Sequence, residues 1–203
     1  MVECVGENVG VINLVAPMLT SLSMDSGEHG NYLVENSHHL IRADIDLYTE
    51  GYSDISKALT DLLKGLSDVQ FLKLGFSAEV DLRDIQLPKF LNMTYLELGD
   101  FGSQWKCLQL LLKNFPHLET LVFKNGLGYD HEDAQFLENA ARDLLPSLLY
   151  HLKVIEICDF SQFSGEREWK FVDYLLQNSK VLEKISIDYG DGGSKWTINA
   201  SRS

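Results

Sequence analysis

The sequence predicts an α/β fold, a solenoid with short parallel strands on its concave side and helices and loops on its convex side. Two observations predict it. The apolar pattern L-x-x-L-x-L, with any large apolar residue allowed at the L positions, recurs seven times in the 203 residues. Amphipathic segments with helical periodicity lie between several copies. Strands that alternate with helices are typical of a parallel sheet.

The spacing of the seven copies indicates a leucine-rich-repeat solenoid. Their central residues follow one another at intervals of 21 to 34 residues, and leucine-rich repeats have periods of about 20 to 29 residues. Side chains alternate between the faces of a strand, so the L positions point inward and the x positions outward. Stacked neighbours then bury one continuous core. The central residues are Leu22, Ala43, Leu72, Leu96, Leu121, Ile155 and Ile185.

The segments between the strands predict helices that carry the chain back. The stretch 53–66 places Leu59, Leu62 and Leu63 on one face, with Ser53 as the N-cap and Gly65 near the end. Similar periodicity predicts helices over 103–115, 132–145 and 166–178. In these helices the inward face is expected to carry Trp105, Trp169, Val172, Leu175 and Leu176. The first 50 residues have looser connections between strands.

Composition and charge narrow the class of protein. The formal net charge is −13, and no cluster of lysines and arginines appears, so we expect neither nucleic acid nor a membrane as a partner. The acidity suits solubility or attraction to a basic partner. Three cysteines without C-x-x-C spacing fit a reducing compartment. With no signal peptide recognised at the N-terminus, the expected location is cytoplasmic or nuclear.

No pattern in the sequence predicts catalysis, a cofactor or a metal. Adjacent His38 and His39 would point to opposite faces of a strand and could not chelate together. The glycine-rich stretch 190–194 lacks the lysine and helix of a phosphate-binding loop. Cys158 stands next to Asp159, which disfavours the thiolate. We therefore expect a binding protein and not an enzyme.

The x positions of the parallel strands are the predicted partner-binding surface. They carry six acids and four bases, with apolar side chains at Phe71, Tyr95, Val122 and Val154 inside a polar surround, as in binding hot spots. A slip of one residue in the strand register would turn every inward side chain outward and every outward side chain inward. The predicted partner-binding residues on this concave face are Arg42, Asp44, Phe71, Lys73, Tyr95, Glu97, Val122, Lys124, Val154 and Glu156.

Four stretches resemble the plant F-box/FBD/leucine-rich-repeat proteins: 14–22, 39–47, 115–123 and 151–187. The resemblance covers about residues 12–188, and the block 151–187 is similar to the C-terminal FBD element. It implies irregular leucine-rich repeats over 1–147 and an FBD-like repeat unit over 148–190, followed by a flexible tail over 191–203.

The resemblance also implies a function. In that family an F-box binds the Skp1-like adaptor of a ubiquitin ligase, and the repeats recruit the protein to be ubiquitinated. We recognise no F-box-like pattern before the first repeat in these 203 residues, so we expect the Skp1-like adaptor as a partner only if an F-box is supplied elsewhere. The expected partner of the repeats is a protein substrate. A hormone-like small-molecule sensor on the same scaffold, or a truncated product without independent activity, remain alternatives.

Overall fold

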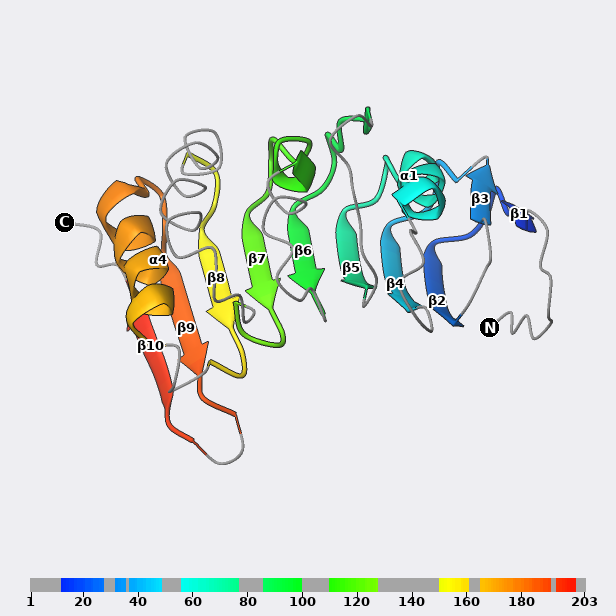
Figure 1. Ribbon diagram of the computed structural model, residues 1–203. Helices are drawn as coiled ribbons and strands as arrows, with labels where there is room; N and C mark the ends of the chain where they lie inside the picture. Colours follow the sequence, from blue (N-terminus) through cyan, green and yellow to red (C-terminus); the bar gives the residue numbers. More distant parts are fainter. Residues whose placement is uncertain are drawn as a thin grey trace.

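A computed structural model describes residues 12–27, 32–35, 37–48, 56–76, 86–99, 110–127, 150–160, 165–190 and 193–199. Eight strands form one sheet, in the order β10-β9-β8-β7-β6-β5-β4-β2 (Figure 1). Their bounds are β2 (Ser21–Gly27), β4 (Arg42–Tyr48), β5 (Phe71–Phe76), β6 (Tyr95–Leu98), β7 (Thr120–Phe123), β8 (Val154–Ile157), β9 (Lys184–Asp188) and β10 (Lys195–Asn199).

Seven of these strands are the seven copies of the sequence pattern. The strands β2, β4, β5, β6, β7, β8 and β9 pair in parallel, each with the next one along the chain in this set. Their register joins the central residues of consecutive copies, for example Leu72 with Leu96 and Leu96 with Leu121. The predicted α/β class with a mostly parallel sheet is confirmed.

Each of the six strands added after β2 begins with the same backbone hydrogen bond. The amide of its first residue donates to the carbonyl oxygen of the residue just before the preceding strand of the sheet, at 2.9–3.2 Å. A bond repeated in this way fixes the register at every step, because it aligns the start of each strand with the start of the one before. The donors are Arg42, Phe71, Tyr95, Thr120, Val154 and Lys184.

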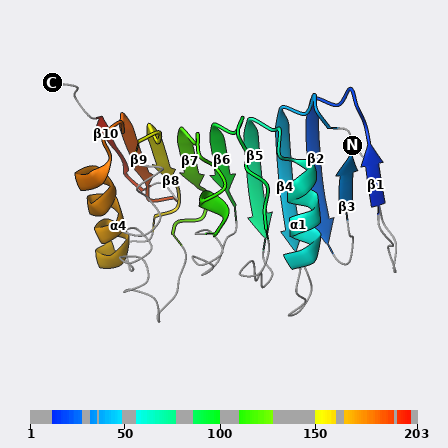
Figure 2. The same cartoon turned by 90° about the horizontal axis from the view of Figure 1, so that it is seen from above.

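A second, two-stranded parallel sheet lies near the N-terminal end of the array (Figures 1 and 2). It consists of β1 (Ile12–Val15) and β3 (Tyr32–Glu35). β3 packs on helix α1 (Ser56–Gly65), and a side chain at Gly65 would collide with the backbone of Val34. Glycine at position 65 therefore permits this close approach. Ser37 Oγ also donates to the Gly65 carbonyl oxygen at 2.5 Å.

Two helices in the described residues agree with prediction. The helix predicted over 53–66 corresponds to α1, in which Leu59, Leu62 and Leu63 are buried as expected. The one predicted over 166–178 corresponds to α4 (Gly165–Asn178). The predicted cap Ser53, Trp105 and the helix over 132–145 lie outside the described residues, as does most of the helix over 103–115. No helix in the described part of the chain has the length and apolar character needed to cross a membrane.

The inward face of α4 differs from the prediction at two residues. The helix buries Phe171, Val172 and Leu175 against the sheet, and the Phe171 ring lies 6.2 Å from that of Phe123. Trp169 is 38% exposed and Leu176 is 41% exposed, so their assignment to the core was wrong. Residues advance by about 100° per position around a helix, which leaves both side chains on the flank of the buried stripe.

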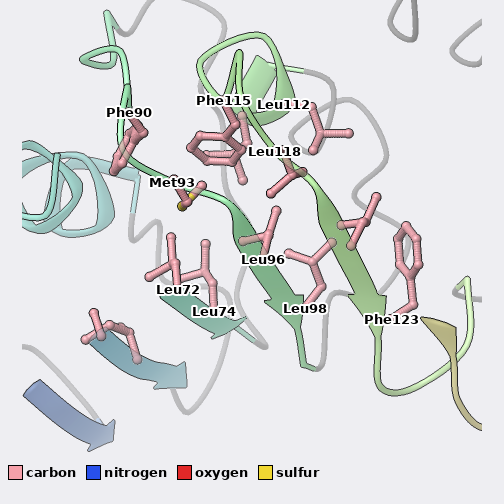
Figure 3. Packing of buried hydrophobic residues seen from close by; sticks show 14 of the residues in the cluster. Leu72, Leu74, Phe90, Met93, Leu96, Leu98, Leu112, Phe115, Leu118 and Phe123 are labelled. Carbon is pink, nitrogen blue, oxygen red and sulfur yellow. The ribbon is translucent and has the colours of Figure 1, made fainter. Parts of the chain in front are cut away.

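The apolar core lies on the sheet face that both helices cover. Figure 3 shows its centre, where leucines of β5 and β6 meet Met93 and the segment before β7. Two rings in this region pack edge to face, with the centroids of Phe90 and Phe115 5.0 Å apart. Two rows of fully or nearly fully buried side chains cross the parallel strands: Ala43, Leu72, Leu96, Leu121, Ile155 and Ile185, and Ile45, Leu74, Leu98, Phe123, Ile157 and Ile187.

The strand β10 was not predicted, because its residues were assigned to a flexible tail over 191–203. Lys195–Asn199 instead pairs antiparallel with β9 at the edge of the sheet. Trp196 is 57% exposed there, and it pairs in register with Ile187, so it belongs to the face of the sheet that carries the core. The short connection after β9 is rich in glycine, which allows this reversal. The same glycine-rich composition led to the prediction of a flexible tail.

The central core row gives a direct test of the fold. Leu96→Ala should lower the free energy of unfolding by about 2 to 5 kcal/mol, because it leaves a cavity between β5 and β7. Leu91, which is 61% exposed, is the matched control, and Leu91→Ala should change it by no more than about 0.5 kcal/mol. Urea denaturation measures both. Equal effects at the two positions would contradict the assignment of the core.

Candidate protein-binding face

The sheet face opposite the core carries the x positions of the repeats, and we call it the open face. Parallel register arranges its side chains in rows that cross the strands. The first row is Ser21, Arg42, Phe71, Tyr95, Thr120, Val154 and Lys184. The second row is Ser23, Asp44, Lys73, Glu97, Val122, Glu156 and Ser186. A third row begins with Asp25, Asp46 and Gly75.

The ten residues predicted to bind a partner come together on this face. Nine of them occupy the first and second rows on β4 to β8, and Lys124 follows directly after β7. The one-residue slip that would have turned them inward does not occur, because the L positions are the buried ones. Whether these residues bind a partner stays a prediction.

An aromatic ladder crosses three strands in the first row. The Arg42 guanidinium carbon lies 4.8 Å from the centroid of the Phe71 ring, and the Phe71 and Tyr95 rings are 5.9 Å apart with an interplanar angle of 44°. A cation over an aromatic face is attracted by the electron density of the ring. Phe71 and Tyr95 are only partly buried, so the ladder offers accessible apolar surface between charged neighbours.

Tyr95 is held in place by the carboxylate two residues further along its own strand. Its hydroxyl donates to Glu97 Oε2 at 2.8 Å, and Lys73 Nζ lies 3.3 Å from Glu97 Oε1. Burial, the hydrogen bond to Glu97 and the negative charges of Glu97 and Glu156 all raise the pKa of the Tyr95 phenol. Tyr95 is therefore a neutral donor at physiological pH, with a fixed ring orientation.

Two residues of the predicted site are less accessible than expected. Val122 is 3% exposed and Glu97 is 9% exposed. Val122 lies between Glu97 and Glu156 in the second row. Val122 cannot serve as an exposed anchor in this arrangement, since a partner would have to displace its neighbours. Phe71 and Tyr95 remain partly exposed, and so does Val154 on β8.

The C-terminal part of the open face is occupied by its own ion pair. Lys184 Nζ lies 2.9 Å from Glu156 Oε1. Next to this pair in the second row, Ser186 is 2% exposed, and its hydroxyl has no hydrogen-bond partner among the residues that the structure describes. Burial is the main cause that raises the pKa of the Cys158 thiol. The negative charges of Glu156 and Asp188 raise this pKa further, and the positive charge of Lys124 lowers it. The thiol form is thus favoured.

Asp25, Asp46 and Gly75 belong to the same surface but were not among the ten predicted residues. A Cβ atom at Gly75 would lie 2.7 Å from Asp46 Oδ1, so the Asp46 carboxylate sits over this glycine. Gly99 comes directly after β6, and a Cβ there would lie 3.3 Å from Gly75 Cα. The sequence contains a signal for these three residues, because the alternation L-x-L-x continues beyond the second x position and makes them the next outward-facing residues of their strands.

The described residues contain no group of three or more His, Cys, Asp or Glu side chains placed to hold a metal ion. His38 and His39 lie in a turn before β4 and not on a strand, contrary to the sequence interpretation. His38 Nδ1 is 3.1 Å from Asp68 Oδ2, and both side chains are solvent-exposed. The open face carries paired charges and two neighbouring aromatic rings.

Comparison with known proteins places the chain among plant repeat proteins. It is 27% identical over 201 residues to F-box/LRR-repeat protein 13 of Arabidopsis thaliana, covering 91% of this chain and 43% of the relative. It is 30% identical over 196 residues to FBD-associated F-box protein At1g66310 of the same plant, covering 91% and 42%. F-box/FBD/LRR-repeat protein At1g78750 is 27% identical over 199 residues, with 91% and 42% covered.

The chain spans about two fifths of the length of the curated relatives that it matches. No solved structure matches it significantly. A family model described as "At1g61320/AtMIF1, LRR domain" matches residues 2–203. The resemblance to plant F-box/FBD/leucine-rich-repeat proteins that the sequence predicted is confirmed, and this chain belongs to the At1g61320/AtMIF1 leucine-rich-repeat domain family.

Proposed function

We propose that this chain is a protein-recognition module that binds its partner through the open face. The observation that carries the proposal is the aromatic ladder of Arg42, Phe71 and Tyr95, which lies partly exposed among charged residues of the same rows. Aromatic and arginine side chains inside a polar surround are the usual composition of interface hot spots. The relatives carry names of repeat proteins, and such arrays act through contact surfaces.

The architecture that we propose for this role is a leucine-rich-repeat solenoid with the open face on its concave side. The same hydrogen bond at each strand start supports it, as do strands added to the sheet in chain order and helices α1 and α4 on the core side. In a solenoid of this kind, each outward-facing position of the strands forms one row of side chains across the sheet, and the partner contacts these rows. The partner would then span several strands and not a single pocket.

Within this role, we propose that the chain acts as the substrate-binding part of a ubiquitin-ligase adaptor. The names of two relatives combine the repeats with an F-box, in one case together with an FBD element, and this supports a division of labour between ligase docking and substrate recognition. The open face would recruit the protein to be ubiquitinated, and an F-box would bind the Skp1-like adaptor.

Substitutions in the aromatic ladder test the binding face. With a partner captured from plant extract and then purified, Tyr95→Ala and Phe71→Ala should each weaken the dissociation constant by about tenfold or more, because hot-spot truncations cost at least about 2 kcal/mol. Tyr95→Phe keeps the ring and loses only the bond to Glu97, so it should stay within about threefold of the unmodified protein. Isothermal titration calorimetry gives these constants.

Trp196→Ala is the matched control, because Trp196 is an exposed aromatic side chain aligned with the core row of β9. It should leave partner binding unchanged. The proposal is wrong if Trp196→Ala weakens binding as much as Phe71→Ala, or if neither ladder substitution has an effect in proteins that melt normally.

The division of labour has its own test. The 203-residue chain should not form a complex with a purified Skp1-like adaptor in size-exclusion chromatography, whereas a fusion of an F-box to the chain should. A stable complex with the chain alone would show that the described repeats, or the segments beside them, dock the ligase. In that case the proposed division of labour between the repeats and an F-box would be wrong.

A further inference from the structure

We infer that a second copy of this chain pairs with β10, so that two sheets join edge to edge into one continuous sheet. The pairing is antiparallel and centred on Thr197, and a two-fold axis relates the two copies. It rests on the exposed apolar side chains at this end of the sheet and on the symmetry of the β10 sequence. The aromatic ladder of the open face takes no part in it, so the inference is independent of the proposed function.

The strand β10 has one edge without a neighbour in the sheet. Of the strands that the structure describes, β10 is the last in the order and pairs only with β9. All five of its residues are exposed. In an antiparallel pair, every second residue directs its N–H and C=O groups away from the neighbouring strand. Edge strands that avoid further pairing carry prolines, bulges or charges, whereas β10 has no proline and a single charged residue, Lys195.

Two large apolar side chains of β10 point to the same face of the sheet. Trp196 is 57% exposed and Ile198 is 37% exposed. Their register partners on β9 are Ile187 and Ile185, which belong to the buried core rows. Trp196 and Ile198 therefore continue the core face beyond β9, where nothing in the described part of the chain covers them fully.

Helix α4 adds to this apolar surface. Trp169 and Leu176 are 38% and 41% exposed, and they lie on one flank because they are seven positions apart, about two turns. Phe171, on the other flank, packs toward β7. The Trp169 ring contacts Phe160, whose ring contacts Tyr189 directly after β9, so the exposed flank faces the β9–β10 end (Figures 1 and 2). Exposed apolar side chains gathered at one end mark an interaction site.

The sequence of β10 fits an identical strand. An antiparallel pair centred on Thr197 places Trp196 of each copy opposite Ile198 of the other, and Thr197 opposite its own counterpart. Aromatic residues opposite β-branched ones, and threonine opposite threonine, are stabilising cross-strand pairs. Lys195 then lies opposite Asn199, so no like charges are opposed.

Other centres fit less well. Facing residues of an antiparallel pair must point to the same face, so the axis has to pass through a residue and not between two residues. A centre at Trp196 would place Ile198 opposite Ser194, and a centre at Ile198 would place Trp196 opposite a residue beyond the end of β10. Only Thr197 lets both apolar side chains of each copy meet apolar partners.

Backbone groups and charge agree with this register. The outward groups of β10 belong either to 195, 197 and 199 or to 196 and 198, and both sets are symmetric about Thr197. The strands nearest the axis, β9 and β10, carry two lysines and one aspartate. The chain as a whole has a net charge of −13, so this edge is a place where two acidic copies meet without opposing carboxylates.

Sedimentation velocity of the full chain tests the association. The dimer fraction should rise reversibly as the chain concentration is raised. A chain that stays monomeric at about 0.5 mM overturns the inference, because its affinity would then be weaker than the millimolar range.

Charge substitutions test whether β10 forms the interface. Trp196→Glu with Ile198→Glu should weaken the dimer about a hundredfold or more, because like charges would be opposed across the axis. Met18→Glu with Leu91→Glu adds the same charge at side chains that are 80% and 61% exposed, and it should stay within about threefold of the unmodified chain. An equal effect of this control shows that the association uses another surface, and the inference is then wrong.

A mixing experiment separates a lost interface from a lost fold. The variant with Trp196→Lys and Ile198→Lys should be monomeric alone, as should the variant with the two glutamates. Mixed together, they should form a heterodimer, because opposite charges then face each other across the axis. Two variants that fold by circular dichroism and do not associate on mixing contradict the pairing.

A disulfide between the copies tests the centre of the pairing. In a chain whose native cysteines are replaced by serine, Thr197→Cys should give a covalent dimer under mild oxidation, because this residue faces its own counterpart. Lys195→Cys should not, because its counterpart lies four residues further along the partner strand, about 13 Å away and beyond the reach of a disulfide. Equal cross-linking of both variants, or of Lys195→Cys alone, overturns the register on a non-reducing gel. None of these outcomes affects the open face, which the Phe71→Ala substitution tests separately.

Discussion

The backbone register between neighbouring parallel strands is the constraint on which the rest of the molecule depends. The same hydrogen bond begins each of the six strands that extend the sheet in parallel from β2, and side chains alternate strictly along a strand. Together they send every L position to the core and every x position to the opposite face. Had a strand slipped by one residue, its core side chains would have turned to the open face and its open-face side chains to the core.

This constraint also makes the surface chemistry regular. Because each row continues across the sheet, a side chain on one strand meets the corresponding side chain of the next one. The Arg42–Phe71–Tyr95 ladder and the Lys73–Glu97 pair both join register partners on neighbouring strands in this way. A surface built in rows suits an elongated protein segment that lies across the strands, and it gives such a segment several independent contacts.

The repeating pattern allowed most of the fold to be predicted from sequence. The positions of Leu72, Leu96 and Leu121 were enough to define the sheet register, because spacing and alternation both carry that information. Accessibility was less predictable: Val122 is an x position, yet it is buried beside Glu97 and Glu156, since long neighbouring side chains cover a short one. The position of Trp169 on the flank of α4 and the pairing of β10 with β9 also depend on tertiary packing, which a local sequence pattern does not reveal.

A cross-link between register partners on the open face tests the central claim most directly. In a chain whose native cysteines are replaced by serine, Thr120→Cys with Val154→Cys should form a disulfide under mild oxidation, because the two residues are aligned on β7 and β8 and adjacent strands are within the distance that a disulfide spans. Thr120→Cys with Glu156→Cys, two residues out of register, should remain reduced. A disulfide in the second pair and none in the first would contradict the register and the surface built on it.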